Sequence, residues 1–205
     1  SKTLKSAEAR MLDGEEFWNN MWLVAIDTAS GQKLWELPAK PMPGTSAVYG
    51  VCANDTFLLQ TSQAGDFAVY AFSLATGKML WRGKYKWEAD HHGKHLSRPA
   101  VVNNKIYLRP LTLDLNDGKV LSSKFPAGHQ CGTYTASSNA LFLRAGNLTM
   151  WDGESQAATR WDRVRPDCWI STIPAEGMLL SPEGGGGCSC GGWLETSIGF
   201  APIRN

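Results

Sequence analysis

The chain has 205 residues, with 20 Lys and Arg against 19 Asp and Glu, which leaves a formal net charge of +1. This near-balance gives no electrostatic basis for binding nucleic acid, and we expect no nucleic-acid partner. Hydrophobic residues make up 43% of the chain, as in a globular protein, and the longest apolar runs, such as residues 21–26, are too short for a membrane span. The first residues lack the apolar segment of a signal peptide, and because the chain starts at Ser we expect a processed or trimmed form.

A sequence repeat runs through most of the chain. Residues 24–35 (VAIDTASGQKLW) recur as YAFSLATGKMLW at residues 70–81, and weaker copies lie at residues 112–121 and 148–161. In each copy an alternating apolar strand meets a polar turn that closes on Gly, and a second strand follows. Asp27 is placed to accept hydrogen bonds from the amides of its turn, as is Asp114 in the third copy. The Trp that ends the best copies is suited to packing one sheet against the next.

Another strand pair precedes each of these hairpins. The expected pairs are residues 47–52 with 56–61, 100–102 with 105–109, and 133–136 with 140–144, and residues 169–203 repeat the scheme once more. Four strands per unit, at a spacing of roughly 40 residues, predict an all-β fold: a β-propeller of four-stranded antiparallel blades. We expect a lead-in segment over residues 1–20 and about four to five blades over residues 21–205. The approximate units are residues 21–45, 46–96, 97–128, 129–168 and 169–205.

The repeated unit is a strand followed by the pattern Asp-x-x-x-Gly-x-x-x-Trp. It resembles the repeat of PQQ-type (quinoprotein alcohol dehydrogenase-like) β-propellers. Residues 24–35 and 70–81 match that repeat well, whereas residues 111–121 lack its Trp and residues 148–161 match weakly. Proteins with this repeat include quinone-binding dehydrogenases, outer-membrane assembly scaffold lipoproteins and exported proteins of planctomycete-type bacteria, which the chain resembles most. The resemblance is specific for fold rather than activity, and it implies an exported bacterial protein, periplasmic or extracellular.

PQQ-type propellers usually close with seven or eight blades, more than this chain supplies. The chain would then be half of a larger ring completed by another segment, a partner for another copy of itself, or a small ring. An open arc would expose two sheet faces, which is unfavourable for a protein standing alone.

Five cysteines carry the first set of site hypotheses. Cys52 lies inside an expected strand and is interpreted as a buried small hydrophobic residue. The other four are expected in or near loops, and two disulfides are the favoured interpretation, with Cys131 or Cys168 bonded to the pair formed by Cys188 and Cys190. The alternatives are a metal site that adds His129 to the thiolates, and a redox-active pair of Cys188 and Cys190.

Three of the four histidines, His91, His92 and His95, lie in one expected loop between blades. A solvated loop is the favoured interpretation, and a ligand or metal pocket at the mouth of the propeller is the alternative. The resemblance to quinoproteins would imply a Cys-Cys dipeptide against the quinone, which this sequence lacks, and it has no Cys-x-x-Cys-His haem site either. We therefore expect no cofactor, with PQQ or a metal ion as the alternative.

These observations predict a non-catalytic binding module that presents its inter-blade loops to a protein or small-molecule ligand, with no catalytic residue assigned. The alternative, from a different class, is a quinoprotein-like or metal-dependent oxidoreductase domain. Its site would be formed by the histidines and cysteines named above, at one face of the propeller.

Overall fold

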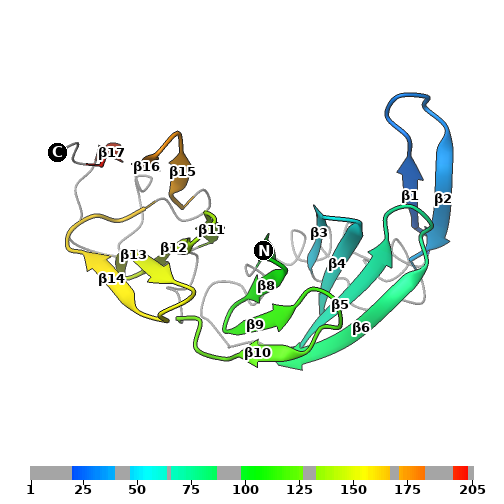
Figure 1. Cartoon of the computed structure of the whole chain (residues 1–205), viewed down its shortest axis with the longest axis horizontal. Coiled ribbons are helices and arrows are strands. Elements are labelled where there is room, and N and C mark those ends of the chain that lie inside the picture. Colours follow the sequence, from blue (N-terminus) through cyan, green and yellow to red (C-terminus); the bar gives the residue numbers. More distant parts are fainter. Residues whose placement is uncertain are drawn as a thin grey trace, which may run out of the picture. The chain divides into compact units, whose positions relative to one another are not determined.

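The computed structural model describes residues 20–39, 47–63, 66–86, 98–126, 133–166, 171–182 and 196–202. The regular secondary structure of these residues consists of β-strands alone, and the strands form five antiparallel sheets (Figure 1). Among the described residues there is no helix that could cross a membrane. The chain divides into two compact units, Ser1–Lys86 and Trp87–Asn205. The predicted all-β class with four-stranded antiparallel sheets is confirmed, while the expected boundaries of the blades stay a prediction.

The first unit contains a hairpin and a complete four-stranded sheet. The hairpin consists of β1 (Trp22–Ile26) and β2 (Lys33–Pro38). The sheet consists of β3 (Ala47–Ala53), β4 (Thr56–Gln63), β5 (Asp66–Ser73) and β6 (Met79–Lys86), paired in chain order.

The second unit contains three sheets, each paired in chain order. Its first sheet consists of β7 (Ala100–Val102), β8 (Lys105–Leu108), β9 (Leu111–Asp114) and β10 (Val120–Ser122). The second consists of β11 (Tyr134–Ala136), β12 (Ala140–Ala145), β13 (Asn147–Asp152) and β14 (Ala158–Trp161). The last consists of β15 (Ile173–Ala175), β16 (Met178–Ser181) and β17 (Ile198–Phe200).

The repeated turn forms as the sequence predicts. In the turn between β1 and β2, Oδ1 of Asp27 accepts hydrogen bonds from the amides of Ala29 (3.1 Å) and Ser30 (2.7 Å) and from the Ser30 hydroxyl (2.8 Å). These bonds favour the carboxylate, so they lower the pKa of Asp27, the amide of Ser30 having the largest effect. Gly31 closes the turn at a φ of 70°, where a residue with a side chain would be strained.

The other copies of the turn keep the same design with different residues. Oδ1 of Asp114 accepts a hydrogen bond of 2.7 Å from the amide of Asn116, which confirms the role predicted for this carboxylate. Between β5 and β6 a serine replaces the aspartate, and Oγ of Ser73 accepts a hydrogen bond of 3.3 Å from the amide of Thr76. Gly77 closes this turn at a φ of 69°.

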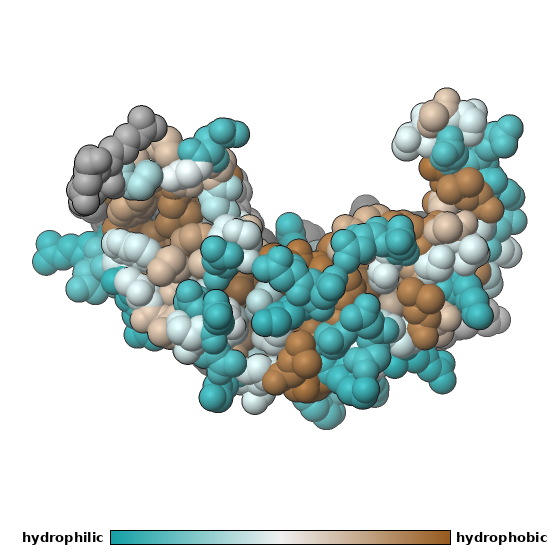
Figure 2. Space-filling view, in the orientation of Figure 1, coloured by the Kyte–Doolittle hydropathy of each residue, from teal (hydrophilic) through white to brown (hydrophobic). Residues whose placement is uncertain are grey.

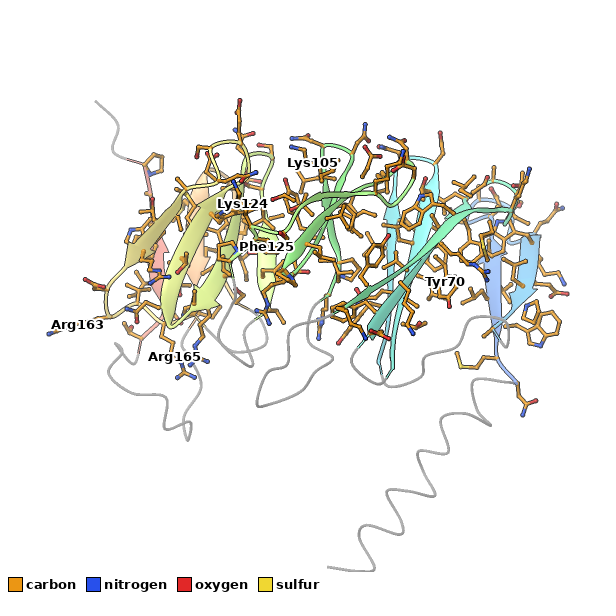
Figure 3. The ribbon with its side chains drawn as sticks, turned by 90° about the horizontal axis from the view of Figure 1, so that it is seen from below. Tyr70, Lys105, Lys124, Phe125, Arg163 and Arg165 are labelled. Atoms are coloured by element: carbon orange, nitrogen blue, oxygen red, sulfur yellow. The ribbon has the colours of Figure 1, made fainter. Side chains whose placement is uncertain are left out.

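The core of the first unit lies between the hairpin and the four-stranded sheet. The buried side chains of Leu59, Tyr70 and Phe72 from the sheet meet Leu23 and Leu37 from the hairpin (Tyr70 is labelled in Figure 3). The contact between the two sheets is therefore made by the alternate apolar residues that the sequence pattern places on one face of each strand.

The core of the second unit lies between the sheets β7–β10 and β11–β14. The ring of Phe125 stacks on Trp151 at 5.2 Å and meets Tyr134 edge-on at 5.0 Å, while Tyr107 meets Trp151 edge-on at 6.0 Å (Phe125 is labelled in Figure 3). The Tyr134 hydroxyl donates a hydrogen bond of 2.9 Å to the carbonyl of Tyr107. Aromatic packing and this buried hydrogen bond together fix one sheet against the next.

Candidate functional site

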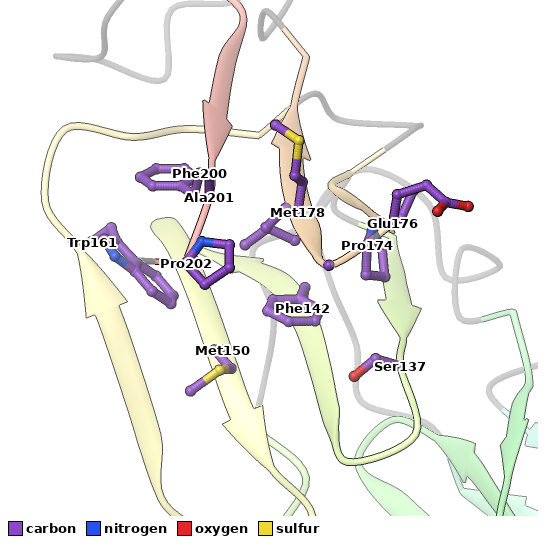
Figure 4. A pocket seen from close by; sticks show the side chains of 13 residues that line it. Ser137, Phe142, Met150, Trp161, Pro174, Glu176, Met178, Phe200, Ala201 and Pro202 are labelled. Atoms are coloured by element: carbon purple, nitrogen blue, oxygen red, sulfur yellow. The ribbon is translucent and has the colours of Figure 1, made fainter. Parts of the chain in front are cut away.

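An apolar groove of about 500 Å³ lies between the sheet β11–β14 and the last sheet (Figure 4). The lining residues come from both sheets and are mostly aromatic, aliphatic or sulfur-containing. The side chains used below are Phe142, Met150, Trp161, Pro174, Leu179 and Phe200. We call this the aromatic groove.

The pairing of the strands places these side chains on facing surfaces. Phe142 on β12 and Met150 on β13 are cross-strand partners, so both point to the same side of their sheet. Across the groove, Phe200 on β17 is the partner of Leu179 on β16. The rings of Trp161 and Phe200 lie 5.9 Å apart and join the two walls.

The groove stays open because the last sheet, which forms its second wall, has fewer strands than the sheet β11–β14. In the described part of the chain the sheet β11–β14 has four strands, whereas the last sheet has three and ends at β17. Trp161, on the outermost strand of the complete sheet, therefore meets one ring of the last sheet and keeps part of its own surface accessible.

The chemistry of the groove suits an apolar side chain. Aromatic rings offer large contact area at low entropic cost, and methionine adapts its shape to the group that it meets. Two polar side chains, Ser137 and Glu176, also line the groove (Figure 4). The arrangement can hold an apolar group and orient it by a few polar contacts, as ligand-binding clefts generally do.

A second, polar pocket of about 410 Å³ lies between the sheets β7–β10 and β11–β14. There Nδ2 of Asn103 donates a hydrogen bond of 2.9 Å to the carbonyl of Ser138 on the neighbouring sheet. The Tyr107 hydroxyl lies 2.9 Å from the position that a Cβ on Gly153 would take. Since these groups already contact one another, we interpret this pocket as part of the contact between the two sheets.

The site residues predicted from the sequence lie outside the described residues. They are His91, His92, His95, His129, Cys131, Cys168, Cys188 and Cys190. Disulfide pairing and metal ligation by these residues therefore stay predictions. Within the described ranges no group of three His, Cys, Asp or Glu side chains could hold a metal ion.

The prediction that Cys52 is buried is wrong: this thiol is free and exposed. The edge strand β3 carries Cys52, and its cross-strand partner is Phe57. Both residues line an apolar pocket of about 370 Å³ beside the hairpin. In the described part of the chain the hairpin has two strands where a complete sheet has four, so it leaves this part of the sheet uncovered.

Sequence reasoning did not single out the aromatic groove. Trp161 appeared only as the end of a weak repeat, and Phe142, Met150 and Phe200 lie in strands that look ordinary in the sequence. The signal that could have found the groove is the incomplete fifth repeat, because a complete sheet packed against a partial one leaves apolar side chains accessible.

Each four-stranded antiparallel sheet has its strands paired in chain order, and neighbouring sheets within a unit pack face to face. This is the arrangement of blades in a β-propeller. Comparison with solved structures supports the same class. BamB from Moraxella catarrhalis superposes with a TM-score of 0.55 at 14% sequence identity, over 80% of this chain and 53% of that chain. The computationally designed Ika4 protein superposes with a TM-score of 0.52 at 14% identity, over 78% of this chain and 94% of that chain.

Both of these structures are β-propellers, and this chain has the β-propeller fold that the repeat predicted. It matches about half the length of the BamB chain. No family model and no curated protein matches the sequence.

Proposed function

We propose that this chain is a propeller module that binds a partner protein, and that the aromatic groove receives an apolar side chain of the partner. The observation that carries the proposal is the groove itself, in which the half-buried rings of Trp161 and Phe200 are accessible and Phe142 lines the wall. Aromatic residues and methionine are enriched at the centres of protein interfaces, where they contribute most of the binding free energy.

The proposed setting is the periplasm or the outside of a bacterial cell. The sequence resemblance to exported PQQ-type repeat proteins, including scaffold lipoproteins, supports this setting. A scaffold role needs a surface for another polypeptide rather than a catalytic centre, and the groove provides a surface of that chemistry.

The test uses the whole chain, labelled with ¹³C at the methionine methyl groups, and two short capped peptides as probes. One peptide carries a single Leu between glycines, and the other carries Ser in its place. We expect the Leu peptide to shift the methyl signal of Met150, which lines the groove. The signals of Met21 and Met79, in the first unit, serve as internal references.

A matched pair of variants locates the binding. Met150 is half-buried in the groove, whereas Met178 projects, like Leu180, from the opposite side of the last sheet. Met150→Glu puts a charge into an apolar groove and is expected to weaken binding at least ~10-fold, whereas Met178→Glu leaves it unchanged. Far-UV circular dichroism checks that both variants fold. Equal binding of the Leu and Ser peptides, or full binding by Met150→Glu, would refute the proposal.

A further inference from the structure

The hairpin β1–β2 presents an apolar face that nothing in the described structure covers. Trp22, Val24 and Ile26 project from one side of β1 and are 56%, 48% and 57% exposed. Figure 2 shows hydrophobic residues at the molecular surface over this hairpin. We call Trp22, Val24 and Ile26 the start face.

Comparison of equivalent positions in two copies of the repeat indicates which kind of surface fits the start face. Val24 and Ile26 correspond to Tyr70 and Phe72, which lie 46 positions further along the chain. Tyr70 and Phe72 are 5% and 2% exposed, because the hairpin packs on them. The same positions thus contact the preceding sheet in one copy of the repeat and are open in the other, so the occupant that fits the start face is another sheet of this type.

The last sheet also has an exposed apolar face, on the side that points away from the preceding sheet. Ile173 on β15 and Leu180 on β16 are cross-strand partners, 41% and 39% exposed. They project from the side of their sheet opposite to Phe200, whose ring contacts the preceding sheet through Trp161. This end face, formed by Ile173 and Leu180, is where a following sheet would pack.

We propose that copies of this chain associate head to tail, with the start face of one copy on the end face of the next. Each copy supplies one apolar sheet face of each sense, and the contact repeats the sheet-on-sheet packing that β1–β2 already makes with β3–β6. Association removes both faces from water, which is the main driving force for interfaces of this kind. The contact is heterologous, so copies form a closed ring or an open chain. The proposal goes beyond the binding function above, because neither face includes Trp161, Phe142 or Phe200.

Two double variants of the full chain test the proposal. Val24→Asp with Ile26→Asp blocks the start face, and Ile173→Asp with Leu180→Asp blocks the end face. Sedimentation velocity should show wild-type mass rising with concentration, and neither variant should self-associate, each binding at least ~10-fold more weakly because charge is forced into an apolar contact. An equimolar mixture of the two variants retains one intact pair of faces and should give a dimer.

Leu121→Asp is the matched control, since Leu121 is 51% exposed on β10 and belongs to neither face. It should associate like the wild type, and far-UV circular dichroism should show that every variant folds. A wild-type monomer at all concentrations overturns the proposal. Self-association by the end-face variant alone also overturns it, since that result means that start faces pair with each other. A mixture that stays monomeric overturns the head-to-tail contact as well.

Discussion

Two glycines of the repeated turn share a conformation and differ in their surroundings. Gly31 and Gly77 have φ values of 70° and 69°, in the region where residues with a side chain are strained. A Cβ on Gly31 would meet nothing within 4 Å, whereas a Cβ on Gly77 would lie 2.7 Å from the ring of Trp35. Trp35 is held there because its Nε1 donates a hydrogen bond of 2.7 Å to the carbonyl of Leu74. Gly77 is thus required both by the backbone and by the contact between hairpin and sheet.

We expect Gly77→Ala to destabilise the protein more than Gly31→Ala does. The backbone strain of about 1–2 kcal/mol applies to both variants. Crowding against Trp35 adds about 1–3 kcal/mol at Gly77 alone. Urea unfolding followed by circular dichroism measures the two free energies of unfolding, and equal losses would contradict the role given to the Trp35 contact.

At the scale of the elements, the contact between β7–β10 and β11–β14 contains a buried phenol. Burial raises the pKa of Tyr134 well above its ordinary value of 10.0, and the positive charge of Arg109 and a backbone hydrogen bond offset this only in part. The folded protein therefore keeps this proton at a pH where the unfolded chain releases it. The stabilisation is fully present below pH 10.0 and is lost as the pH rises toward the raised pKa.

We expect the free energy of unfolding to fall with pH above 10, and to fall less steeply in Tyr134→Phe. Burial also raises the pKa of Tyr70 and Tyr107, so the slope is reduced in this variant rather than abolished. Below pH 10 the variant should lose about 1 kcal/mol, the usual net contribution of one hydrogen bond, because the Tyr107 carbonyl loses its donor. Urea unfolding on both sides of pH 10 measures both effects, and parallel pH profiles would contradict the assignment.

Some features of the strands could be predicted from the sequence, and others could not. The alternation along β1 separates Leu23 and Ala25 on one face from Val24 and Ile26 on the other, as the structure has them, because side-chain direction in a strand is a local property. Which of the two faces turns inward depends on the neighbouring sheet. The exposure of Cys52 was not predictable, since it depends on how many strands the opposing element supplies. The aromatic groove has the same origin, because the accessibility of Trp161 depends on how many strands the neighbouring sheet supplies.

At the scale of the whole molecule, stability is expected to vary from sheet to sheet. In repeat proteins each unit contacts only its neighbours, so stability is close to a sum of local contributions. The strands β4 and β5 are both eight residues long, whereas β15 and β17 have three residues each. Sheets with short strands and a single neighbour open more often than long ones.

The short strands of the last sheet form one wall of the aromatic groove, and this has a consequence for any partner. A group that binds only when the wall is closed shifts the opening equilibrium of that sheet, so amide hydrogen exchange in β15–β17 should slow about a hundredfold at a ligand concentration 100 times its Kd. Exchange in β4 and β5 should stay as it was. Occupancy of the groove and the folding of the last sheet are then one equilibrium, and a partner would determine the fraction of molecules in which the last sheet is folded.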